Sequence, residues 1–169
     1  MENPWDAGTH NLSAYERNGV LLNAGEGNFV DISYLSGADL DSDSRSVVSV
    51  DLNHDGMQDL IVRSNGGGPI HVFENRFPKT NWLEIGLRGT KSNSTGIGAK
   101  LKVEIGDRVL HREFYPHCAF RSQLARYIHF GLGASEKVDR LTIRWPSGVV
   151  QTLEDVSVNQ HLKVTEPSQ

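Results

Sequence analysis

The chain has little of what marks several common protein classes. It has one cysteine, Cys118, in 169 residues, which excludes an intramolecular disulfide and a cysteine-based zinc site. No run approaches the ~18 apolar residues that a membrane-spanning helix needs. The N-terminal segment, MENPWDAGTH, has neither a basic nor an apolar stretch, so no signal peptide is visible. Helix-forming stretches are scarce, whereas the 17 glycines favour β structure with tight turns.

Charge is unevenly divided along the chain. The content of hydrophobic residues (37%) and charged residues (22%) is that of a globular protein. Residues 1–76 carry 4 Lys/Arg and 12 Asp/Glu, a net charge of −8. Residues 77–169 carry 13 Lys/Arg and 9 Asp/Glu, a net charge of +4. The split predicts two domains, 1–76 and 77–169, with different roles. No strongly basic face is expected, which argues against nucleic acid as a partner.

Alternation of apolar and polar residues predicts an all-β fold. Only residues 121–126 and 153–160 are suited to a helical turn. About eleven short strands are expected, separated by turns rich in Gly, Pro or Asn. Twelve apolar runs are the candidates for them: 20–23, 29–33, 47–50, 60–63, 70–75, 82–88, 99–105, 108–114, 127–133, 138–145, 149–153 and 161–166.

The strongest chemical signal is the segment DLNHDGMQDL, residues 51–60. Oxygen ligands recur at alternate positions, and Gly56 stands where the chain has to turn sharply. Such oxygens are the hard ligands that Ca²⁺ prefers. An EF-hand is excluded, because its twelfth position is Val62 and both flanks are predicted strands. The alternatives are an Asx-rich turn without metal, Mg²⁺ or another metal. The predicted ligands are the side chains of Asp51, Asn53, Asp55 and Asp59 and the carbonyl of Met57.

A second acidic series precedes this loop. Asp39, Asp41 and Asp43 have the same alternate spacing, but no glycine turn follows them. The pattern favours a solvated acidic loop. The alternative is that one of these carboxylates completes the coordination of the first ion.

Seven segments of the chain carry recognisable sequence signatures. They are NAGEGNFVDIS (23–33), DLNHDGMQDLIV (51–62), NGGGPIHVFEN (65–75), NWLEIGLRG (81–89), SNSTGIGAKLKV (92–103), HFGLG (129–133) and VDRLTIRWPSG (138–148). The first three look like one FG-GAP/VCBS repeat, and the other four resemble an ASPIC/UnbV domain. Together they resemble the cartilage acidic protein 1-like (CRTAC-like) family.

The resemblance implies a fold, a location and a role. It implies a calcium-binding loop, a periplasmic or extracellular location, and adhesion or scaffolding with no established catalytic activity. A propeller closes with about four or more blades, and this chain has room for roughly one. We therefore expect a partial propeller-blade segment that packs on the ASPIC/UnbV-like β domain or on a partner, because a lone blade leaves apolar faces and strand edges exposed.

No recognised catalytic motif is present in the sequence. Two acid–base pairs can be drawn, His129 with Asp139 and His111 with Glu113, but a lone histidine on a strand is more often structural. We expect a non-catalytic, calcium-binding protein-interaction module. It would be an accessory or scaffolding subunit of a larger extracytoplasmic or membrane-associated assembly, for example an electron-transfer or photosynthetic complex.

Three further features bear on partners. The strands at 20–23 and 70–75 are candidate free edges for strand addition. Five arginines form a candidate protein-interaction surface, or alternatively a solvated face: Arg112, Arg121, Arg126, Arg140 and Arg144. The alternative function, a carbohydrate-binding or adhesion module, would use a stacking platform drawn from Trp5, Trp82, Trp145, Tyr115, Tyr127 and Phe120.

Overall fold

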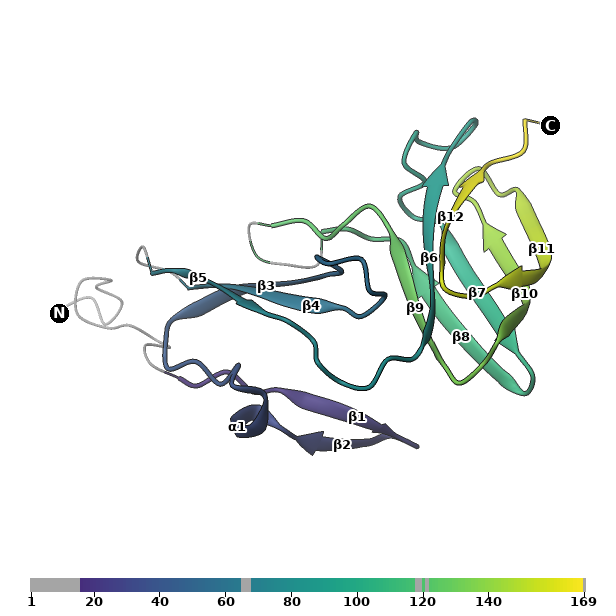
Figure 1. Cartoon of the computed structure of the whole chain (residues 1–169). Coiled ribbons are helices and arrows are strands. Elements are labelled where there is room, and N and C mark those ends of the chain that lie inside the picture. Colours follow the sequence, from purple (N-terminus) through teal and green to yellow (C-terminus); the bar gives the residue numbers. More distant parts are fainter. Residues whose placement is uncertain (1–15, 65–67, 118–119, 121, 169) are drawn as a thin grey trace, which may run out of the picture. The chain divides into compact units, whose positions relative to one another are not determined.

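The computed structural model describes residues 16–64, 68–117, 120 and 122–168 (Figure 1). This part of the chain holds twelve strands and one short helix, which confirms the all-β prediction. No helix within it is long and apolar enough to cross a membrane. The elements are β1 (Leu21–Gly25), β2 (Asn28–Asp31), α1 (Ser33–Ser36), β3 (Ser44–Val50), β4 (Asp59–Ser64), β5 (Ile70–Phe73), β6 (Asn81–Arg88), β7 (Lys100–Ile105), β8 (Arg108–Glu113), β9 (Ile128–Gly133), β10 (Lys137–Arg144), β11 (Val150–Ser157) and β12 (Gln160–Thr165).

The chain divides into two compact units. Unit 1 comprises Met1–Val47 and Ile61–Phe73, and unit 2 comprises Val48–Leu60 and Glu74–Gln169. The Asp-rich loop between β3 and β4 therefore belongs to the same unit as the second half of the chain. The proposed domain boundary between residues 76 and 77 stays a prediction.

Unit 2 contains a sandwich of two sheets, ordered β12-β6-β9 and β11-β10-β7-β8 (Figure 1). Leu83 of β6 lies opposite Phe130 of β9, and every second residue of β7, from Leu101 to Ile105, is buried. Full burial of each such side chain stabilises the fold by about 1.5–3 kcal/mol. The core consists of Leu83, Ile85, Ala99, Leu101, Val103, Ile105, Phe114, Ile128, Phe130, Leu132, Val138, Leu141, Ile143, Trp145, Val156 and Val164.

The outer face of the three-stranded sheet is polar and aromatic. Because successive side chains point to opposite faces, the residues between the core positions of β6, β9 and β12 face outward. They include Trp82 and Glu84 of β6, and Glu84 lies opposite both His129 of β9 and His161 of β12. This face is where the Asp-rich loop lies.

Unit 1 is built from small pieces of sheet. β1 and β2 form a two-stranded hairpin, whose turn residues Glu26 (φ 51°) and Gly27 (φ 78°) both adopt the left-handed backbone of a tight hairpin turn. The sheet β3-β4-β5 lies partly in this unit, which includes β5 and parts of β3 and β4. Among the described residues of unit 1, only Ala38 and Val62 are buried hydrophobic residues.

The helix prediction was wrong in two places. The helix α1 (Ser33–Ser36) was not expected; it is closed by the bond from the Ser36 amide to the Ile32 carbonyl and ends at Gly37, with φ 66°. The segment 153–160 was a candidate helical turn, but β11 continues to Ser157, because Leu153 and Val156 pair with core residues of β10. Residues 122–126 contain no helix, and residue 121 lies outside the described part.

Candidate metal loop and the sheet face beneath it

The Asp-rich loop is folded around its own side-chain oxygens. The Asp51 carboxylate accepts hydrogen bonds from the amides of Asp55 (3.1 Å) and Gly56 (2.8 Å). The Asn53 side chain accepts from the same Asp55 amide at 3.1 Å, and the Asp55 carboxylate accepts from the Met57 amide at 2.9 Å. The oxygens of the first three predicted ligands thus lie along one short stretch of backbone.

Asp59 closes the other end of the loop. Its carboxylate is only 2% exposed, and its two oxygens accept the amides of Leu52 (3.0 Å) and Asn75 (2.8 Å). The Asn75 side chain also donates to the carbonyl of Gln58. Asp59 therefore ties the start of the loop to the segment that follows β5.

Gly56 is required for both the turn and the approach of the sheet. Its φ is +86°, a region that side-chain-bearing residues rarely adopt. A Cβ atom at this position would lie 1.9 Å from Nε1 of Trp82 on β6. The loop thus rests directly on the indole ring, and no other residue fits there without displacing it.

His129 holds the loop from the neighbouring strand. Its Nε2 lies 3.0 Å from the Gly56 carbonyl, and because a carbonyl only accepts, Nε2 carries the proton. The imidazole also stacks on Trp82, with ring centroids 6.4 Å apart. The Lys79 ammonium lies 3.6 Å from the Asp55 carboxylate. These contacts dock the loop on the outer face of β6 and β9.

A second histidine group lies on the same face. The Nδ1 of His161 on β12 is 2.6 Å from the buried carboxylate of Glu84. The His161 ring also makes edge-on contacts with the rings of Trp82 and of His54 in the loop, with ring centroids 5.0 Å and 6.1 Å apart. No pattern in the sequence singles out Glu84 or His161, because the two partners lie more than 70 residues apart in the chain.

The residues present fit a calcium ion by the chemistry of their donors. Asp51 (7% exposed) and Asp59 are buried carboxylates, and neither forms an ion pair among the described residues. Buried charges are costly unless they are paired or bound to a metal. Each carboxylate oxygen accepts one amide and keeps a second lone pair. No group of three His, Cys, Asp or Glu side chains in the described part is placed to hold a metal ion, so Asp51, Asp55 and Asp59 do not converge on one point in this structure.

The earlier acidic series has local partners. Asp39 pairs with Arg17 at 2.9 Å and Asp43 pairs with Arg45 at 2.7 Å. Asp41 forms an isolated backbone bridge with Arg17. All of these residues lie in unit 1, whereas the Asp-rich loop belongs to unit 2. Asp39 and Asp43 are thus ion-paired and only 19% and 20% exposed, unlike the solvated loop that the spacing favoured.

The candidate acid–base residues also have separate structural partners. His129 bonds to Gly56, whereas Asp139 accepts the Gly106 amide at 2.7 Å and pairs with Lys137 at 3.2 Å. The Gly106 amide and the Lys137 ammonium hold the pKa of Asp139 below its ordinary value. His129 and Asp139 stand in different sheets of the sandwich.

The candidate arginine surface is divided by the sheet. Arg112 lies opposite the core residue Leu101, and its guanidinium covers the Phe130 ring at 5.6 Å. Arg140 and Arg144 pair with Glu104 and Lys100, which alternate with the core positions of β7 and so point to the other face. Arg126 is exposed in the segment before β9, and Arg121 lies outside the described residues. The described arginines therefore do not form a single surface.

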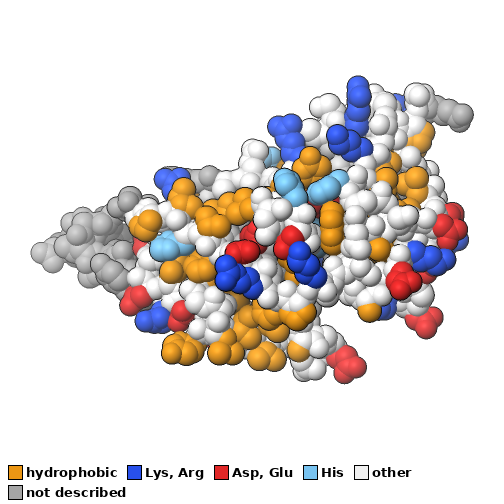
Figure 2. Space-filling model, in the orientation of Figure 1, with side chains coloured by type: hydrophobic (Ala, Val, Ile, Leu, Met, Phe, Trp, Pro, Cys, Tyr) orange, Lys and Arg blue, Asp and Glu red, His pale blue; other side chains and the backbone are white. Residues whose placement is uncertain are grey.

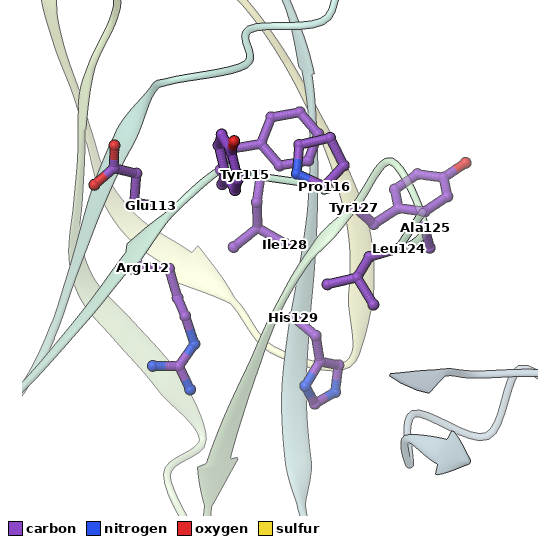
Figure 3. A pocket seen from close by; sticks show the side chains of 10 residues that line it. Arg112, Glu113, Tyr115, Pro116, Leu124, Ala125, Tyr127, Ile128 and His129 are labelled. Carbon is purple, nitrogen blue, oxygen red and sulfur yellow. The ribbon is translucent and has the colours of Figure 1, made fainter. Parts of the chain in front are cut away.

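A small pocket of about 140 Å³ lies at the end of β8 and β9. Its polar ends do not converge: Figure 3 shows the Arg112 guanidinium, the Glu113 carboxylate and the Tyr127 hydroxyl pointing away from one another. The pocket thus offers no paired nucleophile and base. Its lining residues are Arg112, Glu113, Phe114, Tyr115, Pro116, Leu124, Ala125, Tyr127, Ile128 and His129.

Glu166 forms a buried polar centre that the sequence did not reveal. Its carboxylate, 2% exposed, accepts the successive amides of Thr90 (2.8 Å), Lys91 (2.9 Å) and Ser92 (2.8 Å). The hydroxyls of Ser92 and Ser147 donate to its other oxygen. Burial raises the pKa of Glu166, but the hydrogen bonds from Ser147, Ser92 and Thr90 outweigh it and lower the pKa to about 2. The loop 90–92 is thereby fixed to the end of β12.

The second half of the chain is similar to a known protein family. Residues 89–169 match the family model described as ASPIC and UnbV. Strands β7 to β12 of the sandwich therefore form an ASPIC/UnbV domain, as the resemblance implied. Comparison with curated proteins finds no match to this chain.

Proposed function

We propose that the chain is a non-catalytic, calcium-binding protein-interaction module. Its first half would be an FG-GAP/VCBS-type repeat joined to the ASPIC/UnbV domain, the arrangement of CRTAC-like proteins. The observation that carries the proposal is the docking of the Asp-rich loop on the sheet. Gly56 lies against Trp82 and its carbonyl accepts a hydrogen bond from His129, while Asp51 and Asp59 are buried and have no cationic partner among the described residues.

Calcium would be held by Asp51, Asn53, Asp55 and Asp59 and the Met57 carbonyl. Bound there, calcium would neutralise the carboxylates of Asp51, Asp55 and Asp59, which would favour the docked loop over an undocked one. Three residues of the chain also hold the loop in place. The Trp82 ring and the His129 Nε2 fix the Gly56 turn, and Lys79 offsets part of the Asp55 charge. The consequence is a rigid surface made of loop, β6 and β9.

The role we assign is that of an accessory or scaffolding subunit in a larger assembly. An extracytoplasmic, periplasmic or extracellular setting, with a membrane-associated electron-transfer or photosynthetic complex as one host, follows from the resemblance. The carbohydrate-binding alternative is less favoured. Trp145 is 1% exposed and donates to Gln151, and Trp82 is covered by Gly56, so neither offers an open stacking face. Trp5 lies outside the described residues.

Isothermal titration with Ca²⁺ tests the proposal. The wild-type protein should release heat with one equivalent of Ca²⁺ and gain thermal stability, because an ion that binds only the folded state stabilises it. Asp55→Asn should weaken binding at least tenfold. Asp107→Asn, in the exposed turn between β7 and β8, is the matched control and should bind like the wild type. Absence of both heat and thermal shift in the wild type overturns calcium binding.

A further inference from the structure

Unit 1 exposes its apolar side chains instead of burying them. Of the eighteen buried hydrophobic residues in the described chain, sixteen form the core of unit 2 and two lie in unit 1. The largest exposed group in unit 1 surrounds the β1-β2 hairpin. We name it the hairpin patch: Leu21 (62% exposed), Leu22 (41%), Phe29 (60%), Val30 (50%), Tyr34 (87%) and Leu35 (83%).

The hairpin patch has two apolar faces. Leu22 and Val30 are direct cross-strand partners on one face, whereas the register places Leu21 and Phe29 together on the other. Figure 2 shows apolar side chains gathered at the lower edge of the molecule, where Figure 1 draws the hairpin and α1. A two-stranded hairpin is marginally stable alone, and each strand pairs only with the other in the described part. Among the described residues, no third strand pairs with either outer edge of the hairpin.

The exposed apolar area is spread over three surfaces. The six side chains are 41% to 87% exposed and together present on the order of 500–700 Å² of apolar surface, but the two hairpin faces and α1 divide it between them. Each hairpin face is therefore well below the ~800 Å² that one partner of a standard interface buries. A partner of this hairpin has to gain affinity from the free strand edges as well as from apolar contact.

The charge around the patch selects a basic occupant. Between Asn18 and Ser44 the chain has five carboxylates and no Lys or Arg. Asp39 and Asp43 are neutralised by Arg17 and Arg45, but Glu26, Asp31 and Asp41 form no ion pair among the described residues. The Ser33 hydroxyl and amide hold the pKa of Asp31 below its ordinary value, so its charge persists at neutral pH. A second copy of the acidic hairpin would be repelled, whereas a basic chain is attracted.

We propose that the hairpin patch docks an extended, basic polypeptide strand from another protein, which adds to a free edge of the β1-β2 hairpin. When the added strand pairs with β1, its alternate apolar side chains lie beside Leu21 or Leu22. When it pairs with β2, they lie beside Phe29 or Val30. Its Lys or Arg residues approach the unpaired carboxylates. This inference rests on the proposed interaction function and adds the chemistry of the partner.

The test uses a fluorescent eight-residue peptide of alternating Val and Lys and its Val/Glu counterpart, titrated against the full chain by anisotropy. The Val/Lys peptide should bind, and raising NaCl from about 50 to 500 mM should weaken binding at least tenfold. Phe29→Thr with Val30→Thr, and separately Tyr34→Ala outside the strands, should each weaken binding at least fivefold. Val150→Thr, an equally exposed valine on β11 of unit 2, should bind within twofold of the wild type.

Four results overturn the docking proposal. They are absence of Val/Lys binding, equal binding of the Val/Glu peptide, unchanged affinity in both patch variants, and a wild-type dimer that the patch variants dissociate. The last result would make a second copy the occupant. A Ca²⁺ titration of the same samples separates the two proposals. If the protein still releases heat on binding Ca²⁺ but does not bind the Val/Lys peptide, only the docking proposal is wrong.

Discussion

At the scale of single residues, Gly56 makes the sharpest prediction. Gly56→Ala brings a Cβ against the Trp82 ring in a backbone with φ +86°. The left-handed backbone costs about 1–2 kcal/mol, and relieving the clash adds about 1–3 kcal/mol. Urea unfolding should show the combined loss in the free energy of unfolding, and calcium titration should show at least tenfold weaker binding.

Gly148→Ala is the control for this variant. Gly148 has a similar φ of +91°, but a Cβ there meets nothing within 4 Å. It should lose only the backbone contribution of about 1–2 kcal/mol and keep its calcium affinity. Equal losses in the two glycine variants would show that Trp82 does not hold the loop.

Glu166 makes a second residue-scale prediction, about pH. Its pKa in the folded protein is about 2, below the ordinary value of 4.5. Because the folded-state pKa is lowered, the stabilisation is complete above about pH 4.5 and is lost as the pH falls from 4.5 towards 2. Glu166→Gln should lower the melting temperature at pH 7 and flatten the pH dependence between pH 4.5 and 2.

Glu154→Gln is the matched control for the pH measurement. Glu154 pairs with Arg140 on the exposed side of β11 and contacts no buried amide. Surface pairs contribute about 0–1 kcal/mol, so this variant should follow the wild-type curve. A Glu166→Gln curve parallel to that of the wild type would mean that Glu166 does not carry this acid sensitivity.

At the scale of elements, β9 should control the metal loop through one hydrogen bond. His129→Leu removes the donor to the Gly56 carbonyl, and a typical hydrogen bond contributes about 0.5–1.5 kcal/mol. We expect calcium affinity to fall by about 3–10-fold in a titration. His129→Gln keeps a donor at a similar position and should recover most of the loss. If His129→Leu binds calcium like the wild type, the sheet does not position the loop.

Most strands of the second half and the turn at Gly56 could be predicted from the sequence. The strands from 82 to 166 were predicted because apolar residues alternate in them, as Leu101, Val103 and Ile105 do in β7. The local turn chemistry of the Asp-rich loop was also visible, since Gly56 adopts the sharp turn expected of it. The helix α1 was missed because it is a single turn, set by local hydrogen bonds and by Gly37, with no apolar period.

The contacts that organise the site could not be predicted from the sequence. His129 reaches Gly56 across 73 residues, and Glu166 reaches Ser92 across 74. Local patterning does not encode which outer-face residues meet which loop. The arginine surface was wrong for a different reason. Alternation along the strands already places Arg112 on the face of Leu110 and Phe114, and Arg140 and Arg144 on the face opposite Leu141 and Ile143.

At the scale of the whole molecule, the two units should differ in local stability. Unit 2 holds sixteen buried hydrophobic residues of the described chain, whereas unit 1 holds Ala38 and Val62. Amide hydrogen exchange should therefore be at least a hundredfold faster in β1 and β2 than in β6 and β10, because elements with few buried contacts open at low free energy. Equal protection in the two units would mean that unit 1 has a core of its own.

Calcium should fasten the Asp-rich loop to the outer face of β6 and β9. Hydrogen exchange on the full chain during a calcium titration measures this, with the amides of residues 52–57 and of β6 as reporters. We predict that saturating Ca²⁺ slows exchange at both sites at least tenfold in the wild type and at neither in Asp55→Asn. Protection that does not change with calcium, or that rises equally in Asp55→Asn, contradicts this role of calcium.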